Sequence, residues 1–254
     1  MRQVILTALP QFPLVQSGDD LGTMIVSAME RAGLRPEPGD VLVVAQKIVS
    51  KAEDRYAYLN GVAVSAEAEA LAAEVDKDPH LVQLILSESV EVVRKRRGVL
   101  IVRHRKGYVH ANAGIDQSNI DSDPENPRVL LLPTDPDRSA RALRRALRES
   151  FGCEMAVIIN DSAGRAWRNG TVGMAIGSAG FEPVENLVGK ADLYQRRLQT
   201  SEVAVADELA AAASLVMGQA AEASPVVLIR GVALSPVETG SQGLIRESAL
   251  DLFR

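Results

Sequence analysis

The chain has 254 residues, of which 46 % are apolar and 24 % are charged, as in a globular protein that can bury a sizeable core. Its formal net charge of −5 argues against a nucleic-acid-binding protein, because such a protein normally has a basic surface. The single cysteine, Cys153, excludes a disulfide framework and a cysteine metal site. No apolar run is long enough to span a membrane and the first residues do not form a signal sequence, so we expect a cytoplasmic protein with no membrane partner.

The first part of the chain alternates predicted strands and a helix. Residues 2–8 are predicted as a strand that ends in a proline-bounded loop, because proline cannot donate to a ladder. Acidic residues at 19 and 20 offer caps to an amphipathic helix that ends at Gly33. Residues 41–45, VLVVA, are predicted as a buried strand.

Polar residues gather directly after the strand at 41–45, namely Gln46, Lys47, Ser50 and Lys51. These lysines either contact a ligand or belong to a solvated helix start, and composition alone leaves both interpretations open.

Two helices are predicted next. Residues 66–75 are rich in Ala and Glu, and Pro79 at a first-turn position opens a second helix over residues 80–89.

A basic hairpin is expected after these helices. Residues 90–95 and 99–105 are typical of strands, and residues 107–110 extend the sheet. Seven basic residues between positions 94 and 106 form either an exposed hairpin face, which we favour, or a phosphate contact. The three histidines, His80, His104 and His110, show no ligand spacing and are interpreted as surface or sheet residues.

A polar loop, a strand and a helix lead to the most distinctive part of the sequence. Residues 111–127 lack periodicity, which indicates either function or disorder. Residues 129–132 are predicted as a strand and residues 135–149 as a basic-faced helix. Residues 156–160 are predicted as a short buried strand.

The segment 161–170, DSAGRAWRNG, is the strongest candidate for a site. Asp161 and Ser162 supply oxygen ligands at the expected end of a buried strand, and Arg165 supplies a donor. The glycines allow close approach of a ligand to the backbone. An apolar run at 171–177 follows, so the polar segment lies between two buried segments.

The last part of the chain is predicted to contain a helix and a strand. Residues 200–202 are expected to cap an Ala-rich helix that ends near Gly218, and residues 225–230 form a final buried strand. Together these elements predict a mixed α/β fold. We expect one unit over residues 1–254, with room for two subdomains, and find neither a P-loop nor a Rossmann motif.

Carboxylates on loops are the remaining chemical signal. Asp116 and Asp161 are suitable ligands for a hard divalent cation such as magnesium or manganese. Each could equally be a turn former whose side chain caps its own backbone, and composition leaves both interpretations open.

Five motifs, in order and over nearly the whole chain, carry a resemblance to a known family. They are LPQFPLVQSGDDL, VVAQKIVSKAE, ANAGIDQSNI, NDSAGRAWRNG with AIGSAG, and VADELAAAASLVMGQAAEASPVVLIRG. They resemble the GTP-dependent coenzyme F420:L-glutamate ligases, the γ-glutamyl ligase family. The resemblance implies the mixed α/β fold of that family and a homodimer, without the flavin-binding domain that is fused to the ligase in some bacteria.

The same resemblance implies an activity. GTP would activate the lactyl carboxylate of the coenzyme F420 precursor, F420-0, as an acyl phosphate, and the amine of L-glutamate would then attack it. GDP and phosphate would be released, and further γ-linked glutamates could be added. A divalent metal, magnesium or manganese, is the implied cofactor, with potassium as a further candidate.

The implied GTP contacts lie in the first loop, after the second strand and in the C-terminal loop. They are Leu9, Pro10, Gln11, Phe12, Gln46, Lys47, Lys51, Asn119, Met217, Gly218, Gln219, Ala220, Ala221, Glu222, Ala223 and Ser224. The implied metal ligands are Asp116, Asp161, Ser162 and Gln219. Asp116, Asp161 and Arg165 are the expected catalytic groups, because metal ions and cations would offset the repulsion between two anionic substrates.

The chain departs from the family pattern at a few positions. Ser162 stands where threonine is common and keeps the hydroxyl ligand. Ala163 and Ala166 replace bulkier residues or proline, and Gln195 replaces a usual glycine in a segment expected to border the acceptor. Two other functions stay open, a related amide ligase with another acceptor or amino acid and a nucleotide-binding protein without catalysis.

Overall fold

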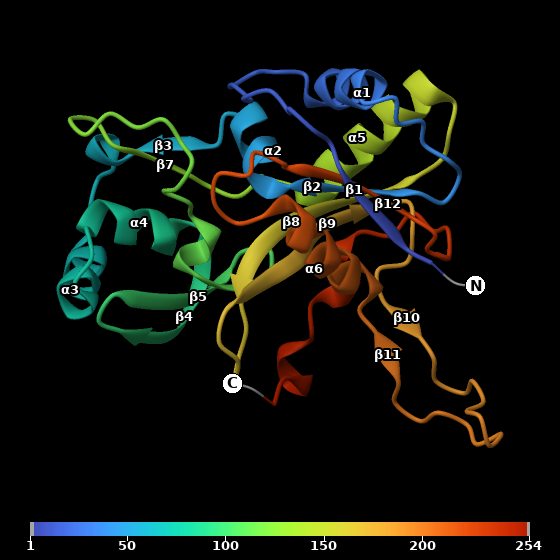
Figure 1. The fold of residues 1–254 in the computed structure, drawn as a ribbon. Coiled ribbons are helices and arrows are strands. Elements are labelled where there is room, and N and C mark those ends of the chain that lie inside the picture. Colours follow the sequence, from blue (N-terminus) through green and yellow to red (C-terminus); the bar gives the residue numbers. More distant parts are fainter. Residues whose placement is uncertain (1–2, 253–254) are drawn as a thin grey trace.

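A mixed sheet of strands that are far apart in the sequence lies at the centre of the structure, a computed structural model that describes residues 3–252 (Figure 1). Within these residues its strand order is β1 (Ile5–Ala8), β12 (Val226–Arg230), β2 (Val41–Ala45), β8 (Ala156–Gly164) and β9 (Thr171–Ala179). β2 and β8 are parallel, whereas the other neighbouring strands are antiparallel. The expected mixed α/β architecture is confirmed.

Helices cover both faces of this sheet. They are α1 (Leu21–Arg31) and α5 (Pro136–Phe151) on one face and α6 (Val205–Met217) on the other. Successive residues of β2 point to opposite faces, so Leu42 and Val44 pack in the cluster with α1 and α5, while Val41 and Val43 pack in the cluster with α6. All four side chains are fully buried, which explains the continuous apolar run of this strand.

A second lobe, residues 56–131, lies beside the sheet (Figure 1). Its elements are β3 (Tyr56–Tyr58), α3 (Ala66–Val75), α4 (Pro79–Ser87), β4 (Ser89–Arg96), β5 (Val99–His104), β6 (Val109–Ala111) and β7 (Arg128–Leu130). The lobe has its own hydrophobic cluster, in which Leu71, Ile85 and Leu100 are buried. Ser65 precedes α3 and Asp78 precedes α4, and the side chain of each accepts a backbone N–H group as an N-cap.

Shorter elements complete the chain. They are α2 (Gln46–Ala52), the strands β10 (Glu185–Asn186) and β11 (Glu202–Val203), and the turns η1 (Leu59–Gly61), η2 (Asn112–Gly114), η3 (Ser241–Leu244) and η4 (Ser248–Leu250). β10 and β11 form an arm that projects from the body (Figure 1). In the part of the chain that the structure describes, no helix combines the length and apolarity needed to cross a membrane.

Three predictions differ from the observed structure by more than one or two residues at the end of an element. The strand predicted at 156–160 continues to Gly164, because β8 and β9 pair as a hairpin in which Asp161 lies opposite Met174. The predicted capping by residues 200–202 is wrong, since Glu202 pairs in the arm and α6 begins after Ala204 without a side-chain cap. The first strand spans Ile5–Ala8, and residue 2 of the predicted strand lies outside the described residues.

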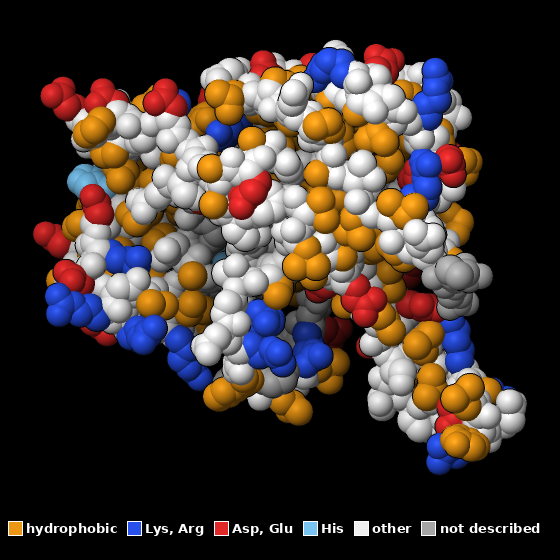
Figure 2. Space-filling view, in the orientation of Figure 1, with side chains coloured by type: hydrophobic (Ala, Val, Ile, Leu, Met, Phe, Trp, Pro, Cys, Tyr) orange, Lys and Arg blue, Asp and Glu red, His pale blue; other side chains and the backbone are white. Residues whose placement is uncertain are grey.

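The basic residues of the β4–β5 hairpin lie on a largely exposed face, and four of the seven form ion pairs. Lys95, Arg97, Arg103 and Arg105 each form an ion pair with an acidic side chain, at 2.6, 2.9, 2.7 and 2.8 Å. Figure 2 shows Lys and Arg side chains gathered along this edge of the second lobe. Their charges are already compensated within the lobe.

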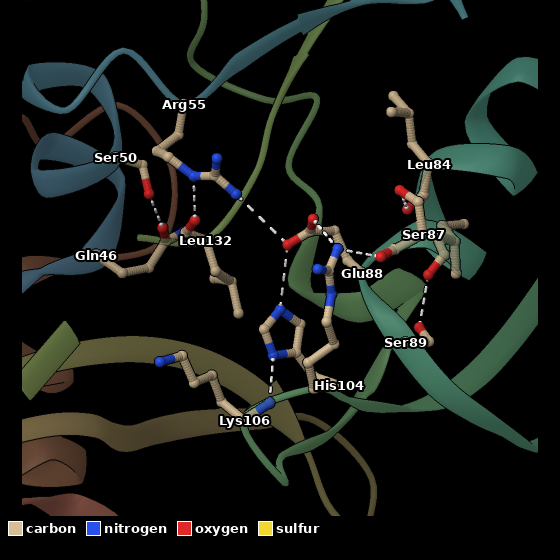
Figure 3. A network of polar contacts seen from close by, with 12 residues as sticks. Gln46, Ser50, Arg55, Leu84, Ser87, Glu88, Ser89, His104, Lys106 and Leu132 are labelled. Carbon is tan, nitrogen blue, oxygen red and sulfur yellow. Dashed lines mark hydrogen bonds and ion pairs between the residues drawn. The ribbon is translucent and has the colours of Figure 1, made fainter. Parts of the chain in front are cut away.

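The ion pair between Arg105 and Glu88 belongs to a network that links the second lobe to Arg55 and Leu132, which flank it in the sequence (Figure 3). Arg55 donates through Nε to the carbonyl of Leu132 at 2.9 Å, and its Nη2 lies 3.4 Å from Glu88 Oε2. His104 Nε2 lies 3.5 Å from the same oxygen. Burial opposes ionisation of Glu88, but His104 and the neighbouring arginines outweigh burial and lower its pKa. Glu88 is therefore a charged anchor between the two parts of the molecule.

The close packing of α6 on β9 predicts a stability effect at Gly173. A Cβ there would lie 2.3 Å from the carbonyl oxygen of Ala210 and 2.3 Å from Ser214 Oγ. We expect Gly173→Ala to lower the free energy of unfolding by about 1–3 kcal/mol, measured by urea denaturation. Gly61→Ala is the control, because a Cβ at Gly61 meets nothing within 4 Å and should change stability by less than about 0.5 kcal/mol. Equal stabilities for the two variants would contradict this packing.

Candidate active site

A cavity of about 740 Å³ opens where β2 passes into the polar start of α2, beside the polar residues 160–162 of β8. Because the two strands are parallel and Ala45 lies opposite Asn160, the residues that follow them emerge side by side. Open α/β sheets commonly bind ligands at the carboxyl ends of parallel strands. Figure 2 shows the surface hollowed between the second lobe and the central body.

Most of the residues implied by the motifs line this one cavity. They are Phe12, Gln46, Lys47, Lys51, Asp116, Asn119, Asp161, Ser162, Met217, Gly218, Gln219, Ala220, Ala221, Glu222, Ala223 and Ser224. Their roles toward a ligand stay predictions.

Four implied residues do not line the cavity, namely Leu9, Pro10, Gln11 and Arg165. Leu9 is fully buried in the core, and its N–H donates to the carbonyl of Val226 at 2.9 Å. Arg165 lies in the β8–β9 hairpin tip, where its Nη1 donates to the carbonyl of Gly170 at 3.1 Å.

Lys47 and Asp116 form an ion pair on the cavity wall. Lys47 Nζ lies 2.9 Å from Asp116 Oδ2 and also donates to the carbonyl of Ser118 at 2.8 Å. The Ser118 hydroxyl donates to the other Asp116 oxygen at 3.0 Å. Gln46 Nε2 approaches Asp116 at 3.5 Å, and its Oε1 accepts the Ser50 hydroxyl at 3.0 Å (Figure 3). The start of α2 therefore orients a carboxylate of the second lobe toward the cavity.

Lys51, one turn further along α2, is held in an unfavourable environment for its charge. Burial lowers its pKa, and the positive charges of Lys47 and Arg128 lower it further, with partial compensation by Asp116. Its Nζ donates to the carbonyl of Asn119 at 2.8 Å. A perturbed lysine lining a cavity is a candidate contact for an anionic ligand.

The C-terminal loop closes the opposite wall. Asn119 Nδ2 donates to the carbonyl of Ala220 at 2.9 Å, which connects the second lobe to this loop. The Ala220 N–H donates to Glu222 Oε2 at 2.8 Å and lowers the pKa of that carboxylate. Gly218 has a φ of 75°, and a Cβ there would lie 2.2 Å from Glu222 Cδ, so this turn requires glycine.

Asp161 is fixed from two sides. Its Oδ1 accepts the N–H of Ser162 at 2.8 Å, and its Oδ2 lies 3.2 Å from His110 Nδ1. His110 is a sheet residue, as the sequence indicated, but it also lines the cavity. The sequence could not reveal this contact, because it joins β6 of one part to β8 of another.

The cavity also contains polar residues that the motifs did not single out, namely Ser118, Asn160 and Thr171. Asn160 donates to Ser214 Oγ at 3.1 Å, while its buried Oδ1 has no hydrogen-bond partner in the structure. The sequence feature that could have marked Asn160 as a cavity residue is its position directly before Asp161.

The donor set suits a hard divalent cation. Asp116, Asp161, Ser162 and Gln219 present carboxylate, hydroxyl and amide oxygens to the same cavity. Over residues 3–252, no group of three or more His, Cys, Asp and Glu side chains could hold a metal ion alone. Magnesium commonly uses one or two carboxylates together with water and substrate phosphates, so the residues present fit such an ion.

Comparison with known proteins agrees with the motifs. The family model described as F420-0:Gamma-glutamyl ligase matches residues 10–231. The chain is 46 % identical over 253 residues to the coenzyme F420:L-glutamate ligase of Methanothermobacter thermautotrophicus, with 99 % of each chain covered. It is 43 % identical over 246 residues to that of Methanopyrus kandleri, which covers 94 % of this chain and 93 % of the relative. It is 40 % identical over 242 residues to that of Archaeoglobus fulgidus, which covers 95 % and 93 %. The resemblance drawn from the motifs is confirmed.

The environment of Lys51 predicts a stability effect that depends on pH. Since the folded state lowers its pKa below the ordinary 10.5, the unfolded chain holds this proton more tightly, and the charged lysine weakens folding at pH 7. We expect Lys51→Met to have a Tm at pH 7 equal to or above that of the unaltered protein. This advantage should shrink as the pH rises toward 10.5, because the lysine then loses its charge in the folded state.

Thermal unfolding at pH 7 and at higher pH measures this effect. Lys47→Met is the matched control, because it leaves Asp116 without its cation and should lower the Tm. A Tm for Lys51→Met well below that of the unaltered protein at pH 7 would contradict the claim that the folded state disfavours the charge of Lys51.

Proposed function

The chain belongs to the F420-0:γ-glutamyl ligase family, and on that premise we propose that it joins L-glutamate to the coenzyme F420 precursor F420-0 in a GTP-dependent reaction. The observation that carries the proposal is one cavity that collects three carboxylates, two lysines and a loop rich in small residues. The relatives over nearly the whole chain are named coenzyme F420:L-glutamate ligases.

The proposed chemistry solves a specific problem. A carboxylate is a poor acylating agent, so the γ-phosphoryl group of GTP is first transferred to the lactyl carboxylate to give an acyl phosphate. The glutamate amine then attacks the acyl carbon, a new C–N bond forms, and phosphate leaves with the oxygen of the former carboxylate. GDP and phosphate are the co-products, and no protein nucleophile is required.

Charge and positioning are what this chain would contribute. Phosphoryl transfer depends mainly on positioning and on stabilising charge on the phosphoryl oxygens. Lys51 and Lys47 would bind phosphate oxygens, and binding would compensate the charge that burial disfavours at Lys51. Asp116, Asp161, Ser162 and Gln219 would hold the divalent ion, which when bound offsets the repulsion between phosphate and carboxylate.

The dimensions and walls of the cavity support a nucleotide. Its volume lies within the range of about 300–1,000 Å³ typical of ligand pockets. Gly218, Ala220 and Ala221 bring main-chain groups close to the cavity without bulky side chains, and we propose that they contact GTP in place of a P-loop.

Product analysis tests the proposed function. Purified protein is incubated with F420-0, L-glutamate, GTP and magnesium or manganese, and the products are identified by mass spectrometry. We expect glutamylated F420 with GDP and phosphate in equal amounts, and the product masses also give the number of glutamates added. Formation of an amide with a different amino acid, or of none under any of these conditions, would overturn the proposal.

We also propose that the protein acts as a homodimer. Leu193 and Tyr194, at the end of the β10–β11 arm, have 96 % and 79 % of their surface exposed, which supports a contact outside one chain. Light scattering of the purified protein should give twice the mass of one chain, and a fully active monomer would contradict this.

The carboxylates of the cavity predict a loss of activity without loss of the fold. We expect Asp116→Asn and Asp161→Asn each to reduce ligation at least about 100-fold, because an amide cannot replace the charge that a divalent ion requires. Asp123→Asn is the matched control, since Asp123 lies on the same loop as Asp116 but does not line the cavity. Full activity in either cavity variant, measured by GDP release, would exclude the role assigned to that residue.

The C-terminal loop predicts separable effects on nucleotide and metal. Ala220→Trp should block GTP binding, because the indole would fill space against the cavity wall. Gln219→Leu should reduce metal-dependent turnover more than metal-free nucleotide binding, because it removes an amide oxygen. Isothermal titration with GTP measures nucleotide binding. Leu215→Trp is the control, because Leu215 is an exposed residue of α6 that does not line the cavity. Unchanged binding and turnover in both loop variants would place the nucleotide elsewhere.

A further inference from the structure

We propose that His110 is a positioning residue that orients the Asp161 carboxylate toward the divalent cation, an inference that rests on the proposed function. His110 lies on β6 in the second lobe, whereas Asp161 lies on β8 of the central sheet. Both line the cavity. The contact therefore links the lobe directly to a carboxylate of the site.

The geometry fixes the carboxylate. His110 Nδ1 lies 3.2 Å from Asp161 Oδ2, while the N–H of Ser162 reaches Oδ1 at 2.8 Å. A carboxylate has about four lone-pair positions on its two oxygens, so each oxygen keeps capacity for a further ligand. With the Ser162 N–H bonded to one oxygen and His110 Nδ1 beside the other, rotation of the carboxylate is restricted and the remaining lone pairs keep a fixed direction.

The same contact predicts where His110 carries a proton. A carboxylate only accepts, so a hydrogen bond across this 3.2 Å contact requires a proton on Nδ1. Nε2 is buried and has no hydrogen-bond partner in the structure. A buried polar atom without a partner is unfavourable, and packing alone does not require it. The contact with Asp161 is the interaction that accounts for a histidine at this position.

His104 provides an internal comparison. It is as buried as His110, and the two rings lie 5.8 and 5.7 Å from the ring of Tyr108. His104 also faces a carboxylate, that of Glu88, but it does not line the cavity (Figure 3). Its Nδ1 accepts the N–H of Lys106 at 3.0 Å, so its proton is on Nε2. The two histidines thus have similar packing, and each has a buried Nε2 without a hydrogen-bond partner, but only His110 lines the cavity.

A partner of a metal-binding carboxylate has a measurable effect on metal affinity. Loss of such an outer hydrogen bond typically weakens metal binding about 10- to 100-fold. We expect His110→Phe, which keeps the ring volume but removes the donor, to weaken Mn²⁺ binding at least about 10-fold. His110→Asn places an amide N–H close to the position of Nδ1 and should restore most of the affinity.

The experiment measures free Mn²⁺ by electron paramagnetic resonance during titration of each variant in the presence of GDP, with Tm recorded in parallel. His104→Phe is the matched control, and it should lower the Tm while leaving the Mn²⁺ affinity unchanged. Nitrogen-15 NMR of the unaltered, metal-free protein should show the proton on Nδ1 of His110 and on Nε2 of His104. The tautomer and His110→Asn decide the proposal even if His110→Phe does not fold.

The outcomes separate the inference from the proposed function. Weaker Mn²⁺ binding in His110→Phe, with recovery in His110→Asn, supports a positioning role. Unchanged Mn²⁺ affinity in a folded His110→Phe, no recovery in His110→Asn, or an Nδ1 of His110 that carries no proton, would overturn it while the unaltered protein still binds Mn²⁺ and ligates glutamate. If the unaltered protein binds no Mn²⁺ and forms no product, both proposals fail together.

Discussion

Residue pairs from Val41 opposite Ala156 to Ala45 opposite Asn160 hold β2 parallel to β8 in the middle of the sheet. Both strands are covered by helices on their two faces, so polar side chains can appear only where the strands leave this buried region. Because the pairing is parallel, both strands reach that point at the same edge. Without this register, Lys47 and Asp161 would not line one cavity.

The cavity contains interactions that are unfavourable without a ligand. Burial lowers the pKa of Lys51, and the buried Oδ1 of Asn160 and Nε2 of His110 have no hydrogen-bond partners in the structure. Among the described residues, His104 Nε2, Asn112 Oδ1 and Ser178 Oγ do not line the cavity and are also buried without a hydrogen-bond partner, whereas the charge of Glu88 is compensated by Arg55 and Arg105. A binding site commonly keeps such unsatisfied groups because the ligand completes their interactions.

The second lobe is positioned by contacts that depend on an irregularity of the sheet. The register between β8 and β9 shifts after Ile159, so Ile176 is left out of the pairing. Its carbonyl instead accepts the hydroxyl groups of Tyr108 and Ser241. Tyr108 directly precedes β6, and this anchor therefore helps to place His110 against Asp161. A bulge beside a site can redirect strands in this way.

Local sequence patterns determined most of the elements and the family. An apolar run, the Ala- and Glu-rich composition and Pro79 predicted β2, α3 and α4 closely, because these signals act between residues near in sequence. The motifs also singled out Asp116, Lys51 and the C-terminal loop, which the structure brings to one cavity. Tertiary structure alone decided that Asp161 lies within a strand, that Leu9 and Arg165 do not line the cavity, and that His110 does. The physical reason is that strand register and contacts between the lobe and the sheet depend on which distant segments pack together, and short-range periodicity carries no information about that choice.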